Sequence, residues 1–571
     1  MNYIDLKNDS EQKWNELNYS EITWIRIGYG ASGEAAGAKK IYDFFLSKTS
    51  KLKNIKVDLV GALGISYAEP LIDITHKDGI RIFYNNVNLK IANRILDEHV
   101  KNNTICLDLA MGQILDNPNS SLIEGLPDLN NEEPLRYTKK IATKNCGAIN
   151  PRNIEHYIAN GGYEGLFKSL DSLTPEKTLD NVKESGLRGR GGAAFSTGVK
   201  WSFLAGNKSP VKYVLANCEE GDPGAFNDKG ILESDPHMLL EGLIICGYST
   251  GASNGHIFIR DGHKIPIENS RKAVEDAYSL GLLGQNIMGT GFNFDVEVSL
   301  TGDSYVAGEE TALMEAIEGK RSMPRFKPPF PAVSGLWGKP SNINNVKTLA
   351  YVPYIINKGS DEYKTIGTKT SSGTAIVCLS GHISRPGMYE IEMGMTINDV
   401  LEKIGGGSST SKEIKLLQTG GPLGGVLGKE GFDVQIDFDA MSKSGAILGS
   451  GGIIVGDEST DVVDLIRNLV AFNQFESCGK CFPCRLGNTH MLDILNRICN
   501  SMPNDNDLEI ISKIGNSMKT GSLCGHGQLG YNPISSAIKY FDSEFKNALK
   551  ANHPVSSDNI NEMILPTRTR P

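Results

Sequence analysis

Apolar and polar positions in the first 115 residues predict a small α/β unit. Residues 22–28 and 57–60 are largely apolar and predict strands, while the apolar positions of 34–46 recur at the spacing of an amphipathic helix. Residues 116–133 are rich in Asn, Asp, Pro and Ser, which is typical of a linker.

From residue 151 the pattern changes to strands that alternate with helices. The expected strands and helices follow one another at 212–216, 235–248, 256–259, 267–280, 294–300 and 309–318. Such alternation predicts a mostly parallel sheet with helices packed on its faces.

The pattern changes again near residue 374. Extended segments at 375–380 and 388–391 flank a Pro-Gly turn, and 396–404 predicts a helix packed on that hairpin. Amphipathic segments then predict a helical region, at 462–475, 485–502, 507–518 and 535–549. The polar residues 552–571 predict a flexible tail.

Composition limits the classes of function. The 571 residues carry 58 Lys and Arg against 67 Asp and Glu, and this net charge of −9 argues against nonspecific nucleic-acid binding. We find no run of about 18 apolar residues that predicts a membrane span. The polar N-terminus does not resemble a secretory signal, so we expect a cytoplasmic protein.

Cysteine spacing gives the strongest chemical signal. Of ten cysteines, Cys478, Cys481 and Cys484 form a C-x2-C-x2-C triplet, and Cys524 follows on a distant segment. Three thiolates at this spacing can converge on one inorganic centre, and a fourth completes the shell of a [4Fe–4S] cluster. Four-cysteine zinc is the alternative, although zinc sites usually show two separated pairs. Thiols kept for a metal also indicate a reducing compartment.

The 63 glycines exceed the usual share of about 7% and gather in loops. One such loop contains Gly189, Gly191 and Ala194 in a G-x-G-x-x-A pattern, with Lys200 available for a phosphate. No predicted strand precedes it, so on its own the loop is as often a structural turn as a ligand site.

A second glycine motif lies upstream. Residues 28–33 follow a predicted strand and open a helix, and Asp58 lies in the next strand, as in a dinucleotide-binding unit. By motif rules alone this turn is a candidate nucleotide site.

Two acidic turns follow predicted strands. Glu219, Glu220, Asp222 and Asp228 come after the strand at 212–216, at the end where open α/β sheets bind ligands. Glu309 and Glu310 open a helix in the same manner, although solvated turns are an equally good interpretation of either segment. Four prolines within 324–331 rigidify a loop that carries Lys327 and Phe330.

Taken together, these segments resemble the NADH-binding flavoprotein subunit of respiratory complex I. The succession is closer still to the beta subunit of multimeric NAD-linked [FeFe]-hydrogenases and related soluble, often electron-bifurcating complexes. It covers about residues 145–545 and keeps the family order of Gly-Arg-Gly-Gly at 189–192, Glu-Gly-Asp-Pro-Gly at 220–224, Gly-Glu-Glu-Thr at 308–311, Lys-Pro-Pro-Phe-Pro at 327–331, Asn-Ile-Asn-Asn-Val at 342–346 and Ser-Cys-Gly-Lys-Cys-Phe-Pro-Cys at 477–484.

The resemblance implies an NADH dehydrogenase (diaphorase) subunit. FMN carries the chemistry: a hydride passes between NAD(H) and FMN, and single electrons pass to one [4Fe–4S] cluster, without a catalytic acid or base from the protein. The residues implied to hold the flavin are Gly189, Arg190, Gly191, Gly192, Lys200, Asn217, Glu219, Glu220, Tyr305, Gly308, Glu309, Ile343, Asn344, Asn345 and Thr348. Those implied to meet NADH are Phe195, Phe203, Asp222, Glu310, Lys327 and Phe330, with Glu220 near the same ribose. The implied cluster ligands are Cys478, Cys481, Cys484 and Cys524.

The implied fold is a multidomain α/β protein. Its expected parts are a degenerate thioredoxin-like domain at 1–115, a linker at 116–145, a Rossmann-like FMN- and NADH-binding domain at 146–345, a small β-grasp (ubiquitin-like) domain at 346–440, a four-helix bundle with the cluster at 441–551 and a flexible tail at 552–571. In hydrogenase-type relatives the thioredoxin-like domain binds a [2Fe–2S] cluster through four cysteines. Here the corresponding turns, 28–33 and 61–70, contain none, which explains the upstream glycine motif without a nucleotide.

The resemblance also implies partners. A small thioredoxin-like [2Fe–2S] subunit and a further catalytic oxidoreductase subunit, ferredoxin-linked in the bifurcating complexes, are expected in the assembly, without nucleic acid. Because no cysteine follows Cys524, we expect one flavin and one cluster in this chain. The alternative is a catalytically silent scaffold or interaction subunit of such a complex.

Overall fold

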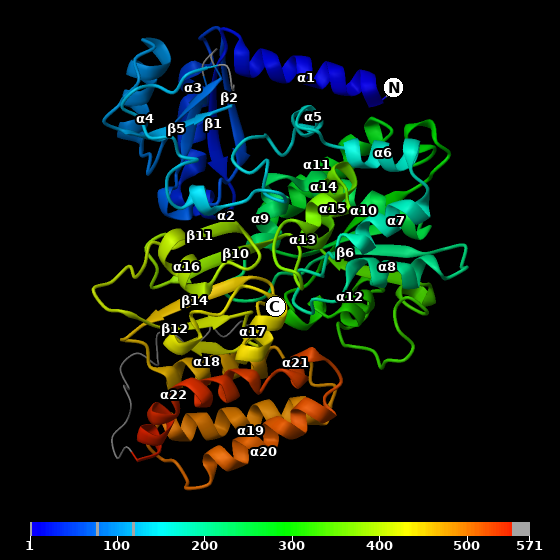
Figure 1. Ribbon diagram of the computed structural model, residues 1–571, viewed down its shortest axis with the longest axis vertical. Helices are drawn as coiled ribbons and strands as arrows, with labels where there is room; N and C mark the ends of the chain where they lie inside the picture. The colour runs from blue at the N-terminus through cyan, green and yellow to red at the C-terminus, as the bar shows by residue number, and fades with distance from the viewer. Residues whose placement is uncertain (1–2, 76–78, 117–119, 551–571) are drawn as a thin grey trace.

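The computed structural model describes residues 3–75, 79–116 and 120–550, and Figure 1 shows its units from the blue N-terminal part to the orange-red helices. The N-terminal sheet has the order β2-β1-β3-β4-β5, in which only β1 and β2 are parallel. Its strands are β1 (Thr23–Tyr29), β2 (Ile55–Gly61), β3 (Ile72–Thr75), β4 (Ile80–Tyr84) and β5 (Ala110–Leu115), with helices α2 (Ala31–Ala36), α3 (Ala38–Thr49) and α4 (Leu89–Ile95).

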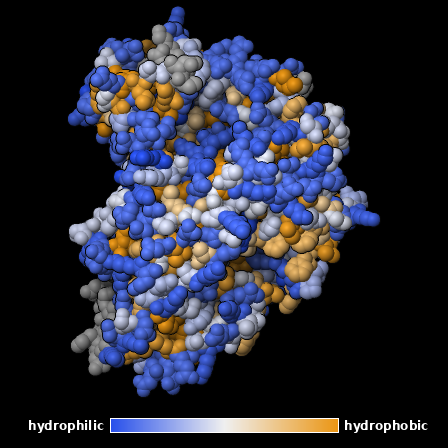
Figure 2. All heavy atoms as spheres, viewed as in Figure 1, coloured by the Kyte–Doolittle hydropathy of each residue, from blue (hydrophilic) through white to orange (hydrophobic). Residues whose placement is uncertain are grey.

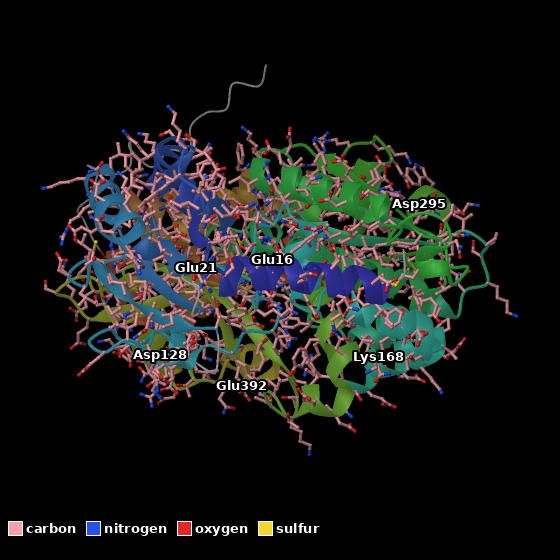
Figure 3. All side chains as sticks on the ribbon, turned by 90° about the horizontal axis from the view of Figure 1, so that it is seen from above. Glu16, Glu21, Asp128, Lys168, Asp295 and Glu392 are labelled. Carbon is pink, nitrogen blue, oxygen red and sulfur yellow. The ribbon has the colours of Figure 1, made fainter. Side chains whose placement is uncertain are left out.

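Helix α1 (Tyr3–Tyr19) joins this unit to the next one. Figure 3 shows it lying across the top of the molecule, over both units. The Trp14 ring meets Trp24 of β1 and His156 of α5 (Ile154–Ala159) edge-on, and the Tyr3 hydroxyl donates to the Gly162 carbonyl oxygen at 2.7 Å. The N-terminal unit is therefore attached to the residues after the predicted linker by packing and hydrogen bonds.

The second sheet has the order β8-β7-β6-β9 and is fully parallel. Its strands are β6 (Tyr213–Cys218), β7 (Asn254–Arg260), β8 (Asp295–Thr301) and β9 (Ser341–Asn345), and its helices include α7 (Pro175–Glu184), α8 (Thr197–Ala205), α9 (Asn227–Ser234), α10 (Pro236–Thr250), α11 (Lys264–Ser279) and α12 (Glu310–Ile317). Because β7 and β9 flank β6 on opposite sides, the strand order switches beside β6, where such sheets form a binding crevice.

The predicted domain boundary at 345 falls too early. Helices α13 (Val346–Ala350), α14 (Val352–Lys358) and α15 (Ser360–Lys364) contribute to the same apolar core as α10, which also includes Ile376, Cys378 and Met388 further along the chain. These helices therefore pack with the second sheet although they lie beyond the predicted boundary, because they bury their apolar faces on it.

The third sheet has the order β11-β10-β14-β12-β13. Its strands are β10 (Thr374–Gly381), β11 (Gly387–Glu392), β12 (Ile414–Thr419), β13 (Val426–Gly428) and β14 (Gly452–Asp457), and β14 runs parallel to β10. The predicted boundary at 440 is also too early, since the central strand β14 lies beyond it.

Four long helices follow, shown in orange and red in Figure 1. They are α18 (Val462–Phe475), α19 (Phe482–Cys499), α20 (Asp507–Gly521) and α22 (Asn532–Lys550), close to the predicted segments. Among the described residues, no helix is both long and apolar enough to cross a membrane. The predicted tail, 552–571, lies outside the described residues.

Two buried polar clusters hold the units together. The Glu390 carboxylate accepts hydrogen bonds from the N–H groups of Ile141 and Thr143, at 2.9 Å each, so the described part of the predicted linker is anchored on β11. In the N-terminal sheet, Arg81 donates to the carbonyl oxygen of Gly147, at the start of the flavin domain.

Candidate flavin, nucleotide and cluster sites

The glycine loop predicted to hold FMN lies between α7 and α8 and packs against the start of α13. The Arg190 N–H donates to Thr348 Oγ1 at 2.9 Å, and a Cβ atom on Gly191 would come within 2.9 Å of Asn345 Cβ. The Arg190 side chain is buried and donates to the Ser372 carbonyl oxygen at 2.7 Å, so this loop can offer its backbone to a ligand but not this guanidinium group.

Lys200 and Asn217 lie close to the carboxyl ends of β6 and β9, where a binding crevice is expected. Lys200 Nζ donates to the Ile343 carbonyl oxygen at 2.7 Å and lies 3.2 Å from Glu310 Oε2. Asn217 Nδ2 donates to the Gly308 carbonyl oxygen at 2.8 Å. The structure thus brings four separate predicted segments to one sheet end.

Asn344 is placed differently from the other predicted flavin residues. Its amide is buried, accepts from Trp201 Nε1 at 3.1 Å and donates to Asn342 Oδ1 at 2.7 Å. These contacts point the side chain into the core, so only its backbone is free to meet a cofactor. Asn345 instead donates to Asp228 Oδ2 at 2.6 Å.

Two cations in this region were missed by the sequence analysis. Arg260, at the end of β7, lies 3.3 Å from Glu219 Oε1, and Lys347 is buried with its Nζ 2.8 Å from Asp228 Oδ1. Their positions at the ends of a strand and at a helix start were the only sequence signals, because their acidic partners lie far along the chain.

Glu219 is buried against Gly308, and burial raises its pKa to about 8 despite Arg260. A carboxyl whose pKa is higher in the folded than in the unfolded state lowers the stability of the fold when it is charged. This loss of stability is absent below about pH 4.5 and complete above about pH 8. We therefore expect Glu219→Gln to stabilise the chain relative to wild type by at least ~1.4 kcal/mol more at about pH 9 than at about pH 6. Denaturant unfolding at both pH values measures this difference, and an equal effect at both would contradict the assignment.

The carboxylates predicted for the NADH ribose are already engaged. Glu220 accepts from the N–H groups of Asp228 and Lys229 at the start of α9, at 2.8 and 2.9 Å. Asp222 accepts from the Tyr305 hydroxyl at 2.7 Å and from Ser450 Oγ at 2.8 Å. Each oxygen of the two groups thus accepts one hydrogen bond from the protein, and contact of these side chains with the NADH ribose stays a prediction.

The second acidic turn is paired with lysines: Glu310 meets Lys200 and Lys327, while Glu309 Oε2 accepts from the N–H group of Thr311. Lys327 Nζ lies 3.1 Å from Glu309 Oε1 and 2.6 Å from Glu310 Oε1, so the proline-rich loop is held over the start of α12. The predicted aromatic residues are exposed by half or more: Phe195 and Phe203, whose ring centroids are 6.4 Å apart, and Phe330. Phe326, which the sequence analysis missed, is 72% exposed on the same loop. Flat exposed rings beside such a crevice can stack on a nucleotide.

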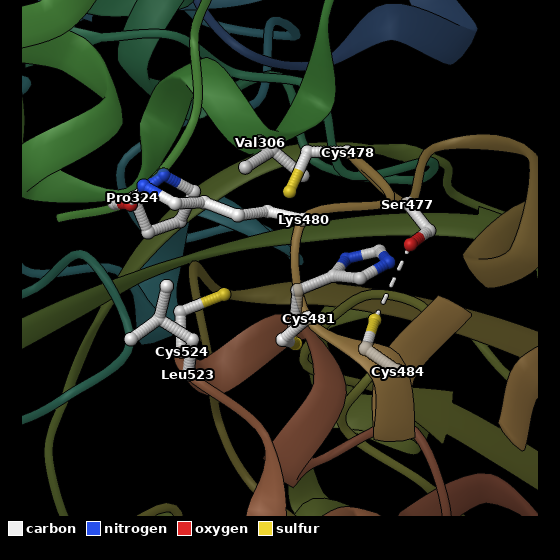
Figure 4. A pocket seen from close by; sticks show the side chains of 10 residues that line it. Val306, Pro324, Ser477, Cys478, Lys480, Cys481, Cys484, Leu523 and Cys524 are labelled. Carbon is white, nitrogen blue, oxygen red and sulfur yellow. Dashed lines mark hydrogen bonds between the residues drawn. The ribbon is translucent and has the colours of Figure 1, made fainter. Parts of the chain in front are cut away.

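The four predicted cluster cysteines line one cavity. Cys478, Cys481 and Cys484 approach it from the start of α19, and Cys524 approaches from the segment before α21 (Gly525–Gln528), as Figure 4 shows. Burial raises the pKa of the Cys484 thiol to about 11, so this sulfur needs a positive centre to become a thiolate ligand at neutral pH. A four-thiol cavity of this kind suits the donor set of a [4Fe–4S] cluster.

One short turn separates the flavin crevice from this cavity. The 3-10 turn η5 (Tyr305–Gly308) contributes Val306 to the wall of the cysteine cavity, while a Cβ atom on Gly308 would lie 2.9 Å from Glu219 Oε2. The Tyr305 ring packs edge-on against His526, which lines the same cavity. The two predicted sites are therefore neighbours.

The turn of the upstream glycine motif, residues 28–33, is occupied by side chains from the end of α9. The Ala31 N–H at the start of α2 donates to Glu233 Oε2 of α9 at 3.1 Å, and a Cβ atom on Gly61 would lie 2.3 Å from Ser234 Cβ. Asp58 accepts from Trp24 Nε1 at 2.9 Å. The end of α9 fills the turn, which supports the interpretation of this motif without a nucleotide.

The surface of the molecule is mixed in character. Figure 2 shows hydrophilic side chains over most of the visible face, with apolar side chains in scattered groups between them. This agrees with the absence of a membrane-spanning helix among the described residues.

Comparison with known proteins agrees with this geometry. Residues 182–354 match the Nuo51 FMN-binding domain family, residues 376–427 the SLBB domain, and residues 464–548 the NADH-ubiquinone oxidoreductase-F iron-sulfur binding region. The SLBB match corresponds to the segment predicted as β-grasp.

Individual relatives match over most of their length. The chain is 45% identical over 407 residues to the HndC subunit of the NADP-reducing hydrogenase of Solidesulfovibrio fructosivorans, covering 71% of this chain and 83% of that protein. It is 38% identical over 415 residues to a subunit of the NADH-quinone oxidoreductase of Escherichia coli (strain K12), covering 72% and 93%. In fold it resembles a chain of the H2-reduced NAD+-reducing [NiFe]-hydrogenase (TM-score 0.64, 24% identity, 96% and 87% covered).

The family matches assign FMN to the crevice domain and a [4Fe–4S] cluster to the C-terminal helices. The chain therefore belongs to the family of NADH-oxidising FMN and [4Fe–4S] subunits that occur in complex I and in NAD-linked hydrogenases.

Proposed function

We propose that electrons from NADH leave the crevice at the end of β6 and reach the cysteine cavity across turn η5. The observation that carries this proposal is the position of η5, which contacts Glu219 on one side and forms the cavity wall on the other. When bound, FMN supplies hydride transfer and the cluster supplies one-electron transfer.

The chain's own residues would bind and orient these groups. The backbone of 189–192 would approach the flavin, with Lys200 near its phosphate. Glu309 would contact the flavin. Glu310 and Lys327 would hold NADH, and Phe195, Phe203 and Phe330 would stack on its rings and exclude water. Cys478, Cys481, Cys484 and Cys524 would ligate the cluster.

We propose that the N-terminal domain is thioredoxin-like and holds no cluster. The support is its strand order, with β1 and β2 parallel and β3 antiparallel to β1, together with the turns filled by α9.

A separate small [2Fe–2S] subunit and a catalytic oxidoreductase subunit, ferredoxin-linked if the assembly bifurcates electrons, would complete the complex. All ten cysteines are unpaired, which fits a reducing compartment such as the cytoplasm. Anaerobic affinity purification with mass spectrometry tests these partners, and recovery of the chain alone would contradict them.

The enzymatic proposal has a direct test against the silent-scaffold alternative. We expect the purified chain, reconstituted with FMN, iron and sulfide, to lose its flavin absorbance when NADH is added anaerobically and to reduce an artificial dye. A scaffold would bind no flavin, and a flavin-loaded sample that stays yellow with NADH would refute the enzymatic proposal. Lys200→Met is a useful companion variant, since loss of its ammonium should weaken flavin binding about tenfold or more.

A further inference from the structure

One of the four cavity thiols has two side-chain hydrogen-bond partners. Ser477 Oγ lies 3.3 Å from Cys484 Sγ, the contact drawn as a dashed line in Figure 4, and Asn488 Nδ2 lies 3.5 Å from the same sulfur. Asn488 is fully buried in α19, one helical turn after Cys484. Its amide also donates to the Cys484 carbonyl oxygen at 3.1 Å, which fixes its orientation.

The direction of these bonds follows from the chemistry of the groups. An amide NH2 can only donate, and a thiolate that ligates iron can only accept, so the Ser477 hydroxyl must donate as well. Two donors therefore point at one ligand sulfur in a site shielded from water, where such bonds are strong.

The sulfurs of the other three cavity cysteines differ from that of Cys484 in their hydrogen-bond donors. Cys524 is the N-cap residue of α21, and its side chain makes no hydrogen bond to the N–H groups of that helix. For Cys478 and Cys481 no side-chain donor is found among the described residues. The side-chain donors thus gather on the sulfur of α19.

We propose that Asn488, together with Ser477, raises the reduction potential of the cluster by donating hydrogen bonds to Cys484 Sγ. Reduction adds negative charge to the cluster and its sulfurs, and donors aimed at a sulfur stabilise that charge. Asn488 is a positioning and tuning residue that makes the cluster a better electron acceptor. This inference rests on the proposed ligation of the cluster by Cys484.

The test is an anaerobic redox titration of the full chain, followed by EPR. We expect Asn488→Leu to lower the midpoint potential by about 59 mV, a tenfold change in the one-electron reduction equilibrium, and Ser477→Ala to lower it in the same direction. Thr489→Val is the matched control, since Thr489 donates to a carbonyl oxygen four residues earlier in α19 and not to sulfur. Its potential should not change.

The redox titration distinguishes a failure of the proposed tuning by Asn488 from a failure of the proposed cluster ligation. A full complement of iron with unchanged potentials in both variants would overturn the inference. Absence of a cluster from the wild-type chain would instead refute the ligation itself. If Asn488→Leu fails to incorporate iron, Asn488→Ala removes the same donor with a smaller side chain and is read in the same titration.

Discussion

Replacing Cys481 by serine should abolish the [4Fe–4S] EPR signal while NADH still removes the flavin absorbance. Cys481 precedes α19 and lines the cysteine cavity, whereas the glycine loop and Lys200 are not among the residues that line it. A serine hydroxyl is a poor substitute for an iron-ligating thiolate, so we expect iron content to fall to background. Electron delivery to one-electron acceptors that take electrons from the cluster should be lost with it.

The control for this variant is Cys499→Ser. Cys499 lies in the same helix and is buried, but it is outside the cavity. Its substitution should keep the EPR signal. If Cys481→Ser retained the signal, the ligand assignment would be wrong, and if it also lost flavin reduction, the flavin site would depend on the cluster.

Replacing Asp73 by alanine should destabilise the N-terminal domain by ~3–5 kcal/mol, because it leaves two buried arginines without their shared partner. Asp73 Oδ1 accepts from Arg26 Nε at 2.8 Å, and its Oδ2 accepts from Arg81 at 2.9 Å. All three side chains are at most 5% exposed. Hydrogen exchange of β1, β3 and β4 should accelerate by about 150-fold to about 5,000-fold, the equivalent of that free energy.

Asp97→Ala is the matched control for that experiment. Asp97 pairs with Lys101 at 2.8 Å on an exposed helical surface, where such pairs contribute ~0.3–0.5 kcal/mol. Equal effects of the two substitutions would show that the buried cluster does not stabilise the domain.

Local motifs were the part of the site that the sequence predicted well. The cysteine triplet was recognised because it is a short segment whose spacing alone indicates the chemistry. The glycine loop and the turn at Glu309, which begins a helix, were assigned only through the succession of segments in family order.

What the sequence could not predict depends on distant partners. Asp222 accepts a hydrogen bond from Ser450, which lies 228 residues away, so nothing near Asp222 in the sequence indicates this partner. Lys347 meets Asp228 from 119 residues away, so nothing near either residue indicates the pair. Strand β14 was missed as a member of the third sheet for the same reason, since its pairing with β10 is long-range.

The end of α9 has a consequence for the path of electron transfer. Glu233 and Ser234 fill the turns of the N-terminal sheet, so this domain, if it holds no cluster as proposed, would offer no electron carrier beside the flavin domain. Electrons from NADH would then pass to the helical bundle and not to the N-terminal domain. Cysteines introduced into those turns would not restore a cluster, because a side chain at Gly61 would collide with Ser234. Only a chain with a shorter or displaced α9 would have room for one.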